Sequence, residues 1–244
     1  MSLIYDKIKK DSAAGKKSVA VLIDPDNLDF DQLDYKIQLA VKAGVDYFFL
    51  GGSLIADDCL ERAIVAIQKA CSIPTVIFPG TAQQINGKAD AILLLSLISG
   101  RNAETLIGKH VVAAPILKKS GLEIISTGYI LVDSGRATTA SYISNTIPIP
   151  HNKPQITACT AMAGEMLGLK LIFLDGGSGA LNPISEKMVA ATRKSVDTPI
   201  IVGGGIKTGE KAAAIFKAGA DIVVVGNAFE DNPELILEIG KSKG

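Results

Sequence analysis

The sequence predicts a closed barrel of eight parallel strands that alternate with helices, the (β/α)8 barrel. Short runs of Val, Ile, Leu and Phe recur about every 25 to 30 residues, and most are followed by a helical pattern. The chain is 244 residues long, close to the roughly 250 residues of such a barrel without insertions. We therefore expect residues 1–244 to form a single domain.

The eight apolar runs lack the polar alternation of half-exposed strands, which is typical of parallel strands buried on both faces. The expected strands are residues 19–23, 47–50, 75–78, 91–95, 123–125, 171–174, 200–202 and 222–225. Amphipathic patterns between them predict helices over residues 32–43, 60–70, 157–167, 185–195 and 210–218. Several of these patterns end at a glycine (Gly44, Gly168 or Gly219), as helix C-termini prefer.

Two segments depart from the regular alternation. Residues 81–89 are too few and too polar for a full helix, so we expect the third helix to be reduced to a turn that opens one side of the barrel. Residues 128–154 are rich in Ser and Thr and contain Pro148, Pro150 and Pro154. We expect a long excursion with a short helix there, on the face where barrel enzymes carry their active sites.

Composition excludes several classes of function. The 25 basic and 25 acidic residues balance, so nothing indicates a nucleic-acid partner or an anionic membrane surface. No apolar run reaches the roughly 18 residues of a transmembrane segment, and the N-terminus lacks the pattern of a signal peptide. We expect a cytoplasmic protein that holds any anionic ligand through local contacts.

The cysteines and histidines do not indicate a metal site. Cys59, Cys71 and Cys159 have no zinc-ligand spacing, so we interpret them as buried free thiols. His110 and His151 have no partner nucleophile and are interpreted as structural.

Glycines follow three adjacent strands at the expected catalytic end. The sixth strand leads into Asp175-Gly-Gly-Ser-Gly-Ala, the seventh into Gly203-Gly-Gly-Ile-Lys, and the eighth into Gly226-Asn227. Glycines allow backbone N–H groups to approach one anion closely, and a following helix N-terminus adds its positive dipole end. Tight turns alone do not need this pattern three times, so we predict a phosphate site.

Asp24 and Ser53 follow the first and second strands. A carboxylate and a hydroxyl at the open end of a barrel suit Mg²⁺, which takes few protein ligands and completes its shell with water and phosphate. The alternative is that Asp24 caps the following turn and Ser53 caps a helix start. The residues alone do not decide between the two.

Asp175 and Tyr129 are the candidate catalytic residues. Asp175 directly follows the sixth strand between glycines, so its carboxylate should face the phosphate cavity, and we predict that it is a general base. Tyr129 comes after the expected fifth strand, which places its phenol near the mouth of the barrel. Its role is either ligand binding or packing.

Together these loops resemble the geranylgeranylglyceryl phosphate synthase family, which includes the bacterial heptaprenylglyceryl phosphate synthases. The resemblance spans nearly the whole chain and is carried by Ile23-Asp24-Pro25, Gly51-Gly52-Ser53 and residues 126–131, 173–180, 203–207 and 226–227. The form of the loops at residues 51–54 and 177–179 is more similar to the archaeal-type branch.

The resemblance implies a site and a reaction. It assigns Mg²⁺ to Asp24 and Ser53, and it assigns sn-glycerol 1-phosphate to Phe173, Leu174, Asp175, Gly176, Gly177, Ser178, Gly179, Gly204, Gly205, Gly226 and Asn227. The implied enzyme is a prenyltransferase of the phosphoglycerol geranylgeranyltransferase type. It joins sn-glycerol 1-phosphate to a polyprenyl diphosphate, and the prenyl chain is expected in a groove beside the reduced third helix. The family usually has Tyr-Leu-Glu where this chain has Phe173-Leu174-Asp175, which removes a phenol and shortens the acid.

Two other functions fit the same loops. One is a phosphate-binding isomerase or lyase that works without metal, and the other is a non-catalytic barrel that binds a phosphorylated metabolite. Apolar helix surfaces also lead us to expect a homo-oligomer, with Tyr142 as a candidate contact.

Overall fold

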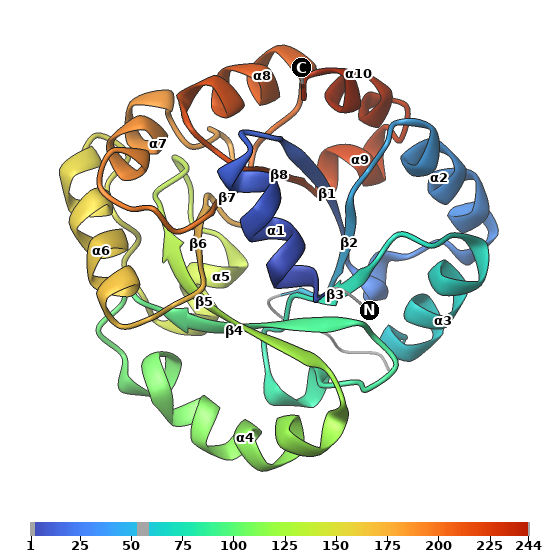
Figure 1. The fold of residues 1–244 in the computed structure, drawn as a ribbon, viewed down its shortest axis with the longest axis horizontal. Helices are drawn as coiled ribbons and strands as arrows, with labels where there is room; N and C mark the ends of the chain where they lie inside the picture. The colour runs from blue at the N-terminus through green and yellow to red at the C-terminus, as the bar shows by residue number, and fades with distance from the viewer. Residues whose placement is uncertain (1–2, 53–58, 244) are drawn as a thin grey trace.

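The fold is a closed barrel of parallel strands, as predicted (Figure 1). The computed structural model describes residues 3–52 and 59–243, and within these residues eight strands pair in sequence order, with β8 closing against β1. The strands are β1 (Ser18–Ile23), β2 (Tyr47–Leu50), β3 (Thr75–Ile77), β4 (Ala91–Leu97), β5 (Glu123–Leu131), β6 (Leu171–Asp175), β7 (Ile200–Gly203) and β8 (Ile222–Val225).

Most helices surround the barrel and cover its outer face, whereas α1 lies across one end (Figure 1). The helices are α1 (Ile4–Ala13), α2 (Phe30–Lys42), α3 (Leu60–Ala70), α4 (Lys109–Ser120), α5 (Thr139–Ser144), α6 (Pro154–Met166), α7 (Glu186–Arg193), α8 (Gly209–Ala218), α9 (Asn227–Asp231) and α10 (Leu235–Lys241). Each of the five predicted helices is present within a few residues of its expected bounds. Gly44, Gly168 and Gly219 follow α2, α6 and α8 with positive φ angles of 70°, 81° and 121°.

Alternation along the strands separates two apolar layers. In β6, Leu171 and Phe173 join the cluster inside the barrel, whereas Ile172 and Leu174 join the cluster between the barrel and its helices. Successive side chains of a strand point to opposite faces, so Asp175 continues the inward series. The pairing of β5 with β6 sets Leu131 opposite Asp175.

The fifth strand corrects one prediction. We expected it over residues 123–125 with Tyr129 in a following loop, but β5 continues to Leu131. Ser126 and Gly128 interrupt the apolar run without ending the strand, because its backbone pairs with β4 and β6 along this length. Gly128 is also a packing requirement, since a Cβ there would lie 2.8 Å from Ile98 Cδ1.

Both irregular segments have the predicted form, except that the excursion begins after Leu131 and not at Gly128. After β3 the chain makes only a three-residue 3-10 turn, η2 (Ala82–Gln84), in place of a full helix. The excursion after β5 contains the short helix α5, which begins with a capping box between Thr138 and Ser141.

Helix α1 closes the end of the barrel at which the strands begin (Figure 1). Glu123, the first residue of β5, accepts hydrogen bonds from the backbone N–H groups of Ile4 (2.6 Å) and Tyr5 (2.9 Å). These are N–H groups at the start of a helix, which have no partner within the helix itself. Glu123 therefore acts as a cap supplied from a distant part of the chain.

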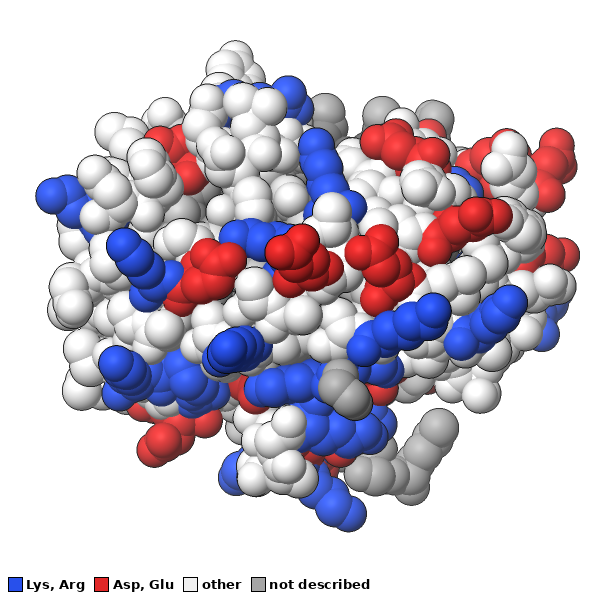
Figure 2. Space-filling view, turned by 90° about the horizontal axis from the view of Figure 1, so that it is seen from above, with Lys and Arg blue, Asp and Glu red and all other residues white. Residues whose placement is uncertain are grey.

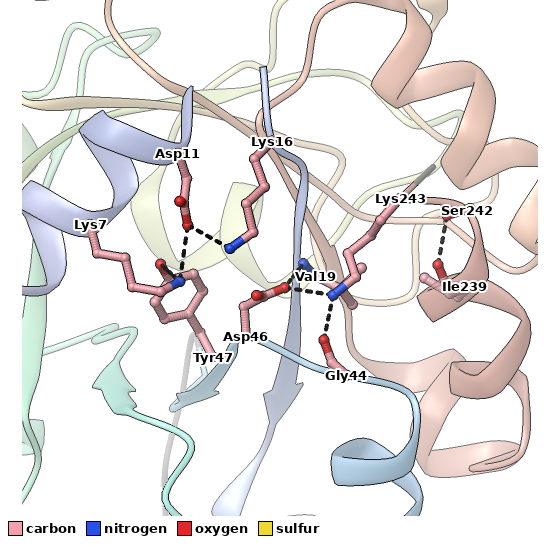
Figure 3. Close-up of polar contacts among 10 residues, drawn as sticks. All are labelled: Lys7, Asp11, Lys16, Val19, Gly44, Asp46, Tyr47, Ile239, Ser242 and Lys243. Atoms are coloured by element: carbon pink, nitrogen blue, oxygen red, sulfur yellow. Dashed lines mark hydrogen bonds and ion pairs between the residues drawn. The ribbon is translucent and has the colours of Figure 1, made fainter. Parts of the chain in front are cut away.

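Polar contacts fix the same end of the barrel (Figure 3). Lys7 donates a hydrogen bond of 3.1 Å to the hydroxyl of Tyr47 at the start of β2. Asp46 accepts hydrogen bonds from the backbone N–H of Val19 (2.9 Å) and from the ammonium group of Lys243 (3.0 Å). The starts of β1 and β2 are thus tied to the C-terminal segment, and a ligand has to enter at the opposite end.

Charged side chains are not evenly arranged on the face shown in Figure 2, where acidic groups form a band and basic groups lie mainly below it. The sequence places five lysines in α1 and the turn after it: Lys7, Lys9, Lys10, Lys16 and Lys17. This cationic charge is at the closed end of the barrel.

Among the described residues, no helix combines the length and apolar composition that a membrane crossing requires. The cysteines are free, as expected, but the prediction that all three are buried is wrong, because Cys159 is exposed on α6 and the other two are half-buried. The apolar side of α6 is filled by other residues of its helical period, such as Ala158 and Ala161.

The cap on α1 gives a test of the closed end. Glu123→Ala removes the acceptor of two backbone N–H groups and should lower the free energy of unfolding by about 1–3 kcal/mol, measured by urea denaturation. Glu123→Gln keeps one carbonyl acceptor, so its free energy of unfolding should decrease less than that of Glu123→Ala. An unchanged midpoint in Glu123→Ala would show that α1 does not depend on this cap.

Candidate active site

A cavity of about 590 Å³ opens where the strands end, opposite α1. Its wall is built by the residues after β1, β2, β6, β7 and β8 together with the excursion after β5. The volume is in the range of small-molecule sites, and the position is that of the active site in barrels of this fold.

The glycine loops form one side of this cavity. Gly177 and Gly179 have φ angles of 84° and 71°, and Gly204 and Gly205 have φ angles of 86° and 73°. A Cβ on Gly204 would lie 2.7 Å from the backbone nitrogen of Gly176, so only glycine fits. The N–H groups of Gly204 and Gly205 have no hydrogen-bond acceptor in the described part of the chain. Two adjacent free N–H groups are what an anion requires.

Asn227 connects two of the predicted ligand loops. Its side-chain oxygen accepts hydrogen bonds from the backbone N–H of Gly179 and from the hydroxyl of Ser178, both at 3.1 Å. Gly226 precedes it at the end of β8 and also lines the cavity. The loops after β6 and β8 are therefore held together without any ligand.

Asp175 and Tyr129 form a buried pair at the base of the cavity. The hydroxyl of Tyr129 donates a 2.6 Å hydrogen bond to Asp175 Oδ2, and the N–H of Gly177 donates to Oδ1 at 2.8 Å. Burial raises the pKa of Asp175, and these two donors oppose the increase. Burial and the neighbouring carboxylate raise the pKa of Tyr129 well above its ordinary value. The phenol thus stays protonated and orients the carboxylate.

The aromatic rings of Phe78, Tyr129 and Phe173 line the polar cavity and pack against one another. The ring centroids of Phe78 and Phe173 are 5.3 Å apart, and those of Tyr129 and Phe173 are 5.7 Å apart with an edge-to-face angle of 86°. Phe173 lines the cavity, as the predicted ligand segment requires. Leu174 points outward into the layer beneath the helices, so its side chain does not contribute to the cavity wall.

A second, apolar groove lies beside the reduced third helix. Its wall consists of residues from η2 and the loop around it, β4, α4 and α5, among them Ile85, Leu94 and Leu117. Gly52, Phe78 and Tyr129 line both this groove and the polar cavity. The groove was predicted at this place, and the shared residues show that the two spaces are adjacent.

Asp24 directly follows β1 and lines the polar cavity. Its carboxylate accepts from the N–H of Asp26 and from the side-chain amide of Asn27, each at 3.2 Å, so the predicted turn cap exists. Gly52 packs against it, since a Cβ there would lie 3.3 Å from Asp24 Oδ2. Ser53, the other predicted metal ligand, lies outside the described residues.

A second carboxylate that the sequence analysis missed stands beside Asp24. Glu230 accepts a 3.3 Å hydrogen bond from the backbone N–H of Asp24 and lines the same cavity. Burial is the first cause of a raised pKa for both carboxylates. No group of three or more His, Cys, Asp and Glu suited to a metal occurs among the described residues. Mg²⁺ is commonly held by only one or two carboxylates plus phosphate oxygens, so this pair fits such an ion.

The excursion after β5 adds another residue that was missed. Arg136 lines the cavity, although only the length and polarity of its segment had marked the region as functional. No local sequence pattern identifies Arg136, because it reaches the cavity only through the tertiary position of this segment.

The histidines have no catalytic partner in the described residues. His110 lies on α4, where Nε2 is 2.8 Å from the backbone oxygen of Leu95, and its ring lines the apolar groove. His151 is exposed, with Nδ1 3.9 Å from a carboxylate oxygen of Asp133.

The fold and the site define a (β/α)8 barrel whose strand ends combine an anion-suited glycine cavity with an adjoining apolar groove. The same topology occurs in proteins with only 14–15% identity, such as a thiamine phosphate pyrophosphorylase from Pyrococcus furiosus and a tryptophan synthase α subunit from Legionella pneumophila, both with a TM-score of 0.58. These likenesses concern the fold alone.

The chain belongs to the PcrB family, whose model matches residues 13–243. It is 56% identical over 226 residues to a geranylgeranylglyceryl phosphate synthase from Spirosoma linguale, covering 93% of this chain and 91% of the relative. It is 39% identical to the synthase of the same name from Pyrococcus furiosus, covering 93% and 88% of the two chains. The predicted family is confirmed, and the chain is an enzyme of the prenyltransferase class.

A solved structure agrees with this assignment. The (S)-3-O-geranylgeranylglyceryl phosphate synthase from Thermoplasma acidophilum, in complex with its substrate sn-glycerol-1-phosphate, has a TM-score of 0.93 and 30% identity to this chain. The match covers 99% of this chain and 98% of that one.

Gly204 provides the test of the anion cavity. Gly204→Val places side-chain atoms against Gly176 and strains a positive φ, and it should weaken binding of sn-glycerol 1-phosphate about 10- to 100-fold by calorimetry, the value of one or two hydrogen bonds to a charged group. Gly168→Val is the matched control, because Gly168 also has a positive φ but no neighbour within 4 Å of a Cβ. Equal affinity in the two variants would contradict an anion site at this loop.

Proposed function

We propose that the enzyme joins the C3 hydroxyl of sn-glycerol 1-phosphate to C1 of a polyprenyl diphosphate, forming an ether and releasing pyrophosphate. The observation that carries this proposal is that the glycine cavity and the apolar groove lie side by side and share Phe78 and Tyr129 in their walls. A reaction between a small phosphorylated alcohol and a long apolar chain needs both spaces and a common wall. An isomerase or lyase of small metabolites has no use for the groove.

Positioning of the glycerol substrate is assigned to the loops after β6, β7 and β8. The free N–H groups of Gly204 and Gly205 would bind phosphate oxygens, while Asn227 keeps the neighbouring turn in place. The phosphate would then fix the glycerol so that its C3 hydroxyl lies towards the base of the cavity. Fixing a reactant in this manner removes much of the entropic cost of a bimolecular step.

Asp175 is the proposed general base. It would accept the proton of the C3 hydroxyl as the oxygen attacks C1 and the bond from C1 to the diphosphate oxygen breaks. Hydrogen bonds from Tyr129 and Gly177 hold the carboxylate of Asp175 in place. The longer side chain of a glutamate is therefore not needed to position the base. Asp175 has to be ionised before it can take the proton, and burial raises the pH at which this occurs.

Asp24 and Ser53 are the proposed ligands of Mg²⁺, with Glu230 as an additional carboxylate beside Asp24. The raised pKa values of Asp24 and Glu230 support this proposal, because a nearby cation would relieve the cost of their negative charge. When bound, the ion would stabilise the negative charge of the departing pyrophosphate.

A homo-oligomer also remains a proposal. Tyr142 on α5 is 84% exposed, which is unusual for an aromatic side chain. Ile107, Val111, Val112 and Ile116 are also exposed, from α4 and the turn before it. A second copy of the chain would cover such surfaces.

The metal proposal leads to one prediction. Asp24→Asn keeps an oxygen that can cap the N–H of Asp26 but removes the charge, and should lower kcat by about 10²-fold or more, the scale of losing one partner of a transition-state charge. The measurement is a steady-state assay at several Mg²⁺ concentrations. Full turnover by the variant, or by the wild type in EDTA, would contradict a magnesium role.

The base proposal leads to another. Asp175→Asn should retain binding of glycerol phosphate and lower kcat by about 10² to 10⁴-fold. In the wild type, kcat should fall as the pH decreases through a pKa above that of an ordinary aspartate, because the active form is the carboxylate and burial raises its pKa. This decrease in kcat should be absent in Asp175→Asn, whereas kcat/KM of both proteins should still fall as the substrate phosphate gains a proton at about pH 6.

Asp175→Glu should retain activity, since it keeps a carboxylate at this point. Wild-type turnover in Asp175→Asn would instead assign proton removal to solvent or to the departing pyrophosphate.

A further inference from the structure

We infer that Arg136 is a phosphate-binding residue, whose guanidinium closes over the glycine turn after β6 and holds the phosphate group of the glycerol substrate. This inference rests on the proposed function and adds a charged contact to a site otherwise made of backbone N–H groups.

The segment that carries Arg136 is fixed at both ends against the loop after β6. Before it, the backbone oxygen of Ser134 accepts hydrogen bonds from the N–H (3.0 Å) and the side-chain amide (3.3 Å) of Asn182. After it, Thr138 begins α5 and lies so close to Gly177 that a Cβ there would be 2.7 Å from the threonine hydroxyl. The arginine therefore extends from an anchored backbone.

Its guanidinium lies directly at the glycine turn. A methyl group added to Gly179 would collide with Arg136 Nη2, and Arg136 contributes to the cavity wall. Within residues 3–52 and 59–243, no carboxylate lies within ion-pair distance of this guanidinium. A planar guanidinium without a partner can donate two parallel hydrogen bonds to one phosphate.

The charge of the cavity favours a cationic contact to the phosphate. Arg136 and Lys207 are the cationic residues in its described wall. The carboxylates in the same wall are Asp24, Asp175, Glu230 and Asp231. The lysines of α1 are at the closed end of the barrel and separated from the cavity by the core. A phosphate dianion thus meets more negative than positive groups, and Arg136 supplies the cation at the turn.

Calorimetry on two variants tests the inference. Arg136→Gln should raise the Kd for sn-glycerol 1-phosphate and for inorganic phosphate about 10- to 100-fold, the usual effect of losing hydrogen bonds to a charged group. Arg136→Lys keeps the positive charge but loses the paired N–H donors of the guanidinium, so its Kd should lie between those of the wild type and Arg136→Gln. Arg101→Gln is the matched control, because Arg101 donates to the backbone oxygen of Gly100 and does not line the cavity. It should bind like the wild type.

The pH dependence separates a phosphate contact from a structural effect. The second pKa of a phosphate monoester is about 6, so lowering the pH from about 7.5 to about 5.5 removes one ligand charge. Wild-type affinity should fall more over this interval than that of Arg136→Gln.

Equal Kd values for the wild type and Arg136→Gln, with normal wild-type turnover, would overturn this inference and leave the proposed function standing. A loss of affinity for glycerol phosphate but not for inorganic phosphate would also overturn it, because Arg136 would then contact the glycerol. Failure of the wild type to bind glycerol phosphate and to turn over would reject the proposed function and the inference with it.

Discussion

The hydrogen bond between Tyr129 and Asp175 is the contact on which the site depends. It joins β5 to the end of β6 inside the barrel, where the parallel register brings two inward-facing side chains together. Both groups are buried, so separating them would leave polar atoms without partners at a cost of about 1–3 kcal/mol. Asp175 also accepts a hydrogen bond from the N–H of Gly177, and Tyr129 lines the apolar groove. One bond thereby fixes the carboxylate, the start of the glycine turn and the wall between the two spaces.

Charge is distributed so that recognition of an anion is local. The lysines of α1 lie at the closed end, and the cavity itself contains more carboxylates than cations. Electrostatic attraction from the whole molecule therefore gives little support to the proposed phosphate binding. In that proposal, backbone dipoles, the free N–H groups of Gly204 and Gly205 and the guanidinium of Arg136 would attract the phosphate at short range. The carboxylates then remain available for a proton and for a cation.

Much of this architecture could be predicted from the sequence because buried parallel strands leave continuous apolar runs. The end of β5 could not, since Ser126, Thr127 and Gly128 look like a loop while barrel pairing keeps them in the strand. Helix α4 could not be recognised from its sequence because it lacks an amphipathic pattern. Apolar residues lie both on its exposed side and on the side that lines the groove. The glycine loops were visible as local sequence, whereas Glu230 and Arg136 join the site only through tertiary contacts. The sequence marked Asp24 as either a metal ligand or the cap of a turn. Only the structure shows that it forms the cap.

The central claim is that the cavity and the groove hold two substrates of one reaction. The most direct measurement is incubation of the enzyme with Mg²⁺, radiolabelled sn-glycerol 1-phosphate and polyprenyl diphosphates of several lengths, followed by extraction into organic solvent. The account predicts that label enters the organic phase as an ether that resists mild alkali, together with one equivalent of released pyrophosphate. Label that stays in the aqueous phase with every prenyl diphosphate, while the protein is folded and binds glycerol phosphate, would contradict it.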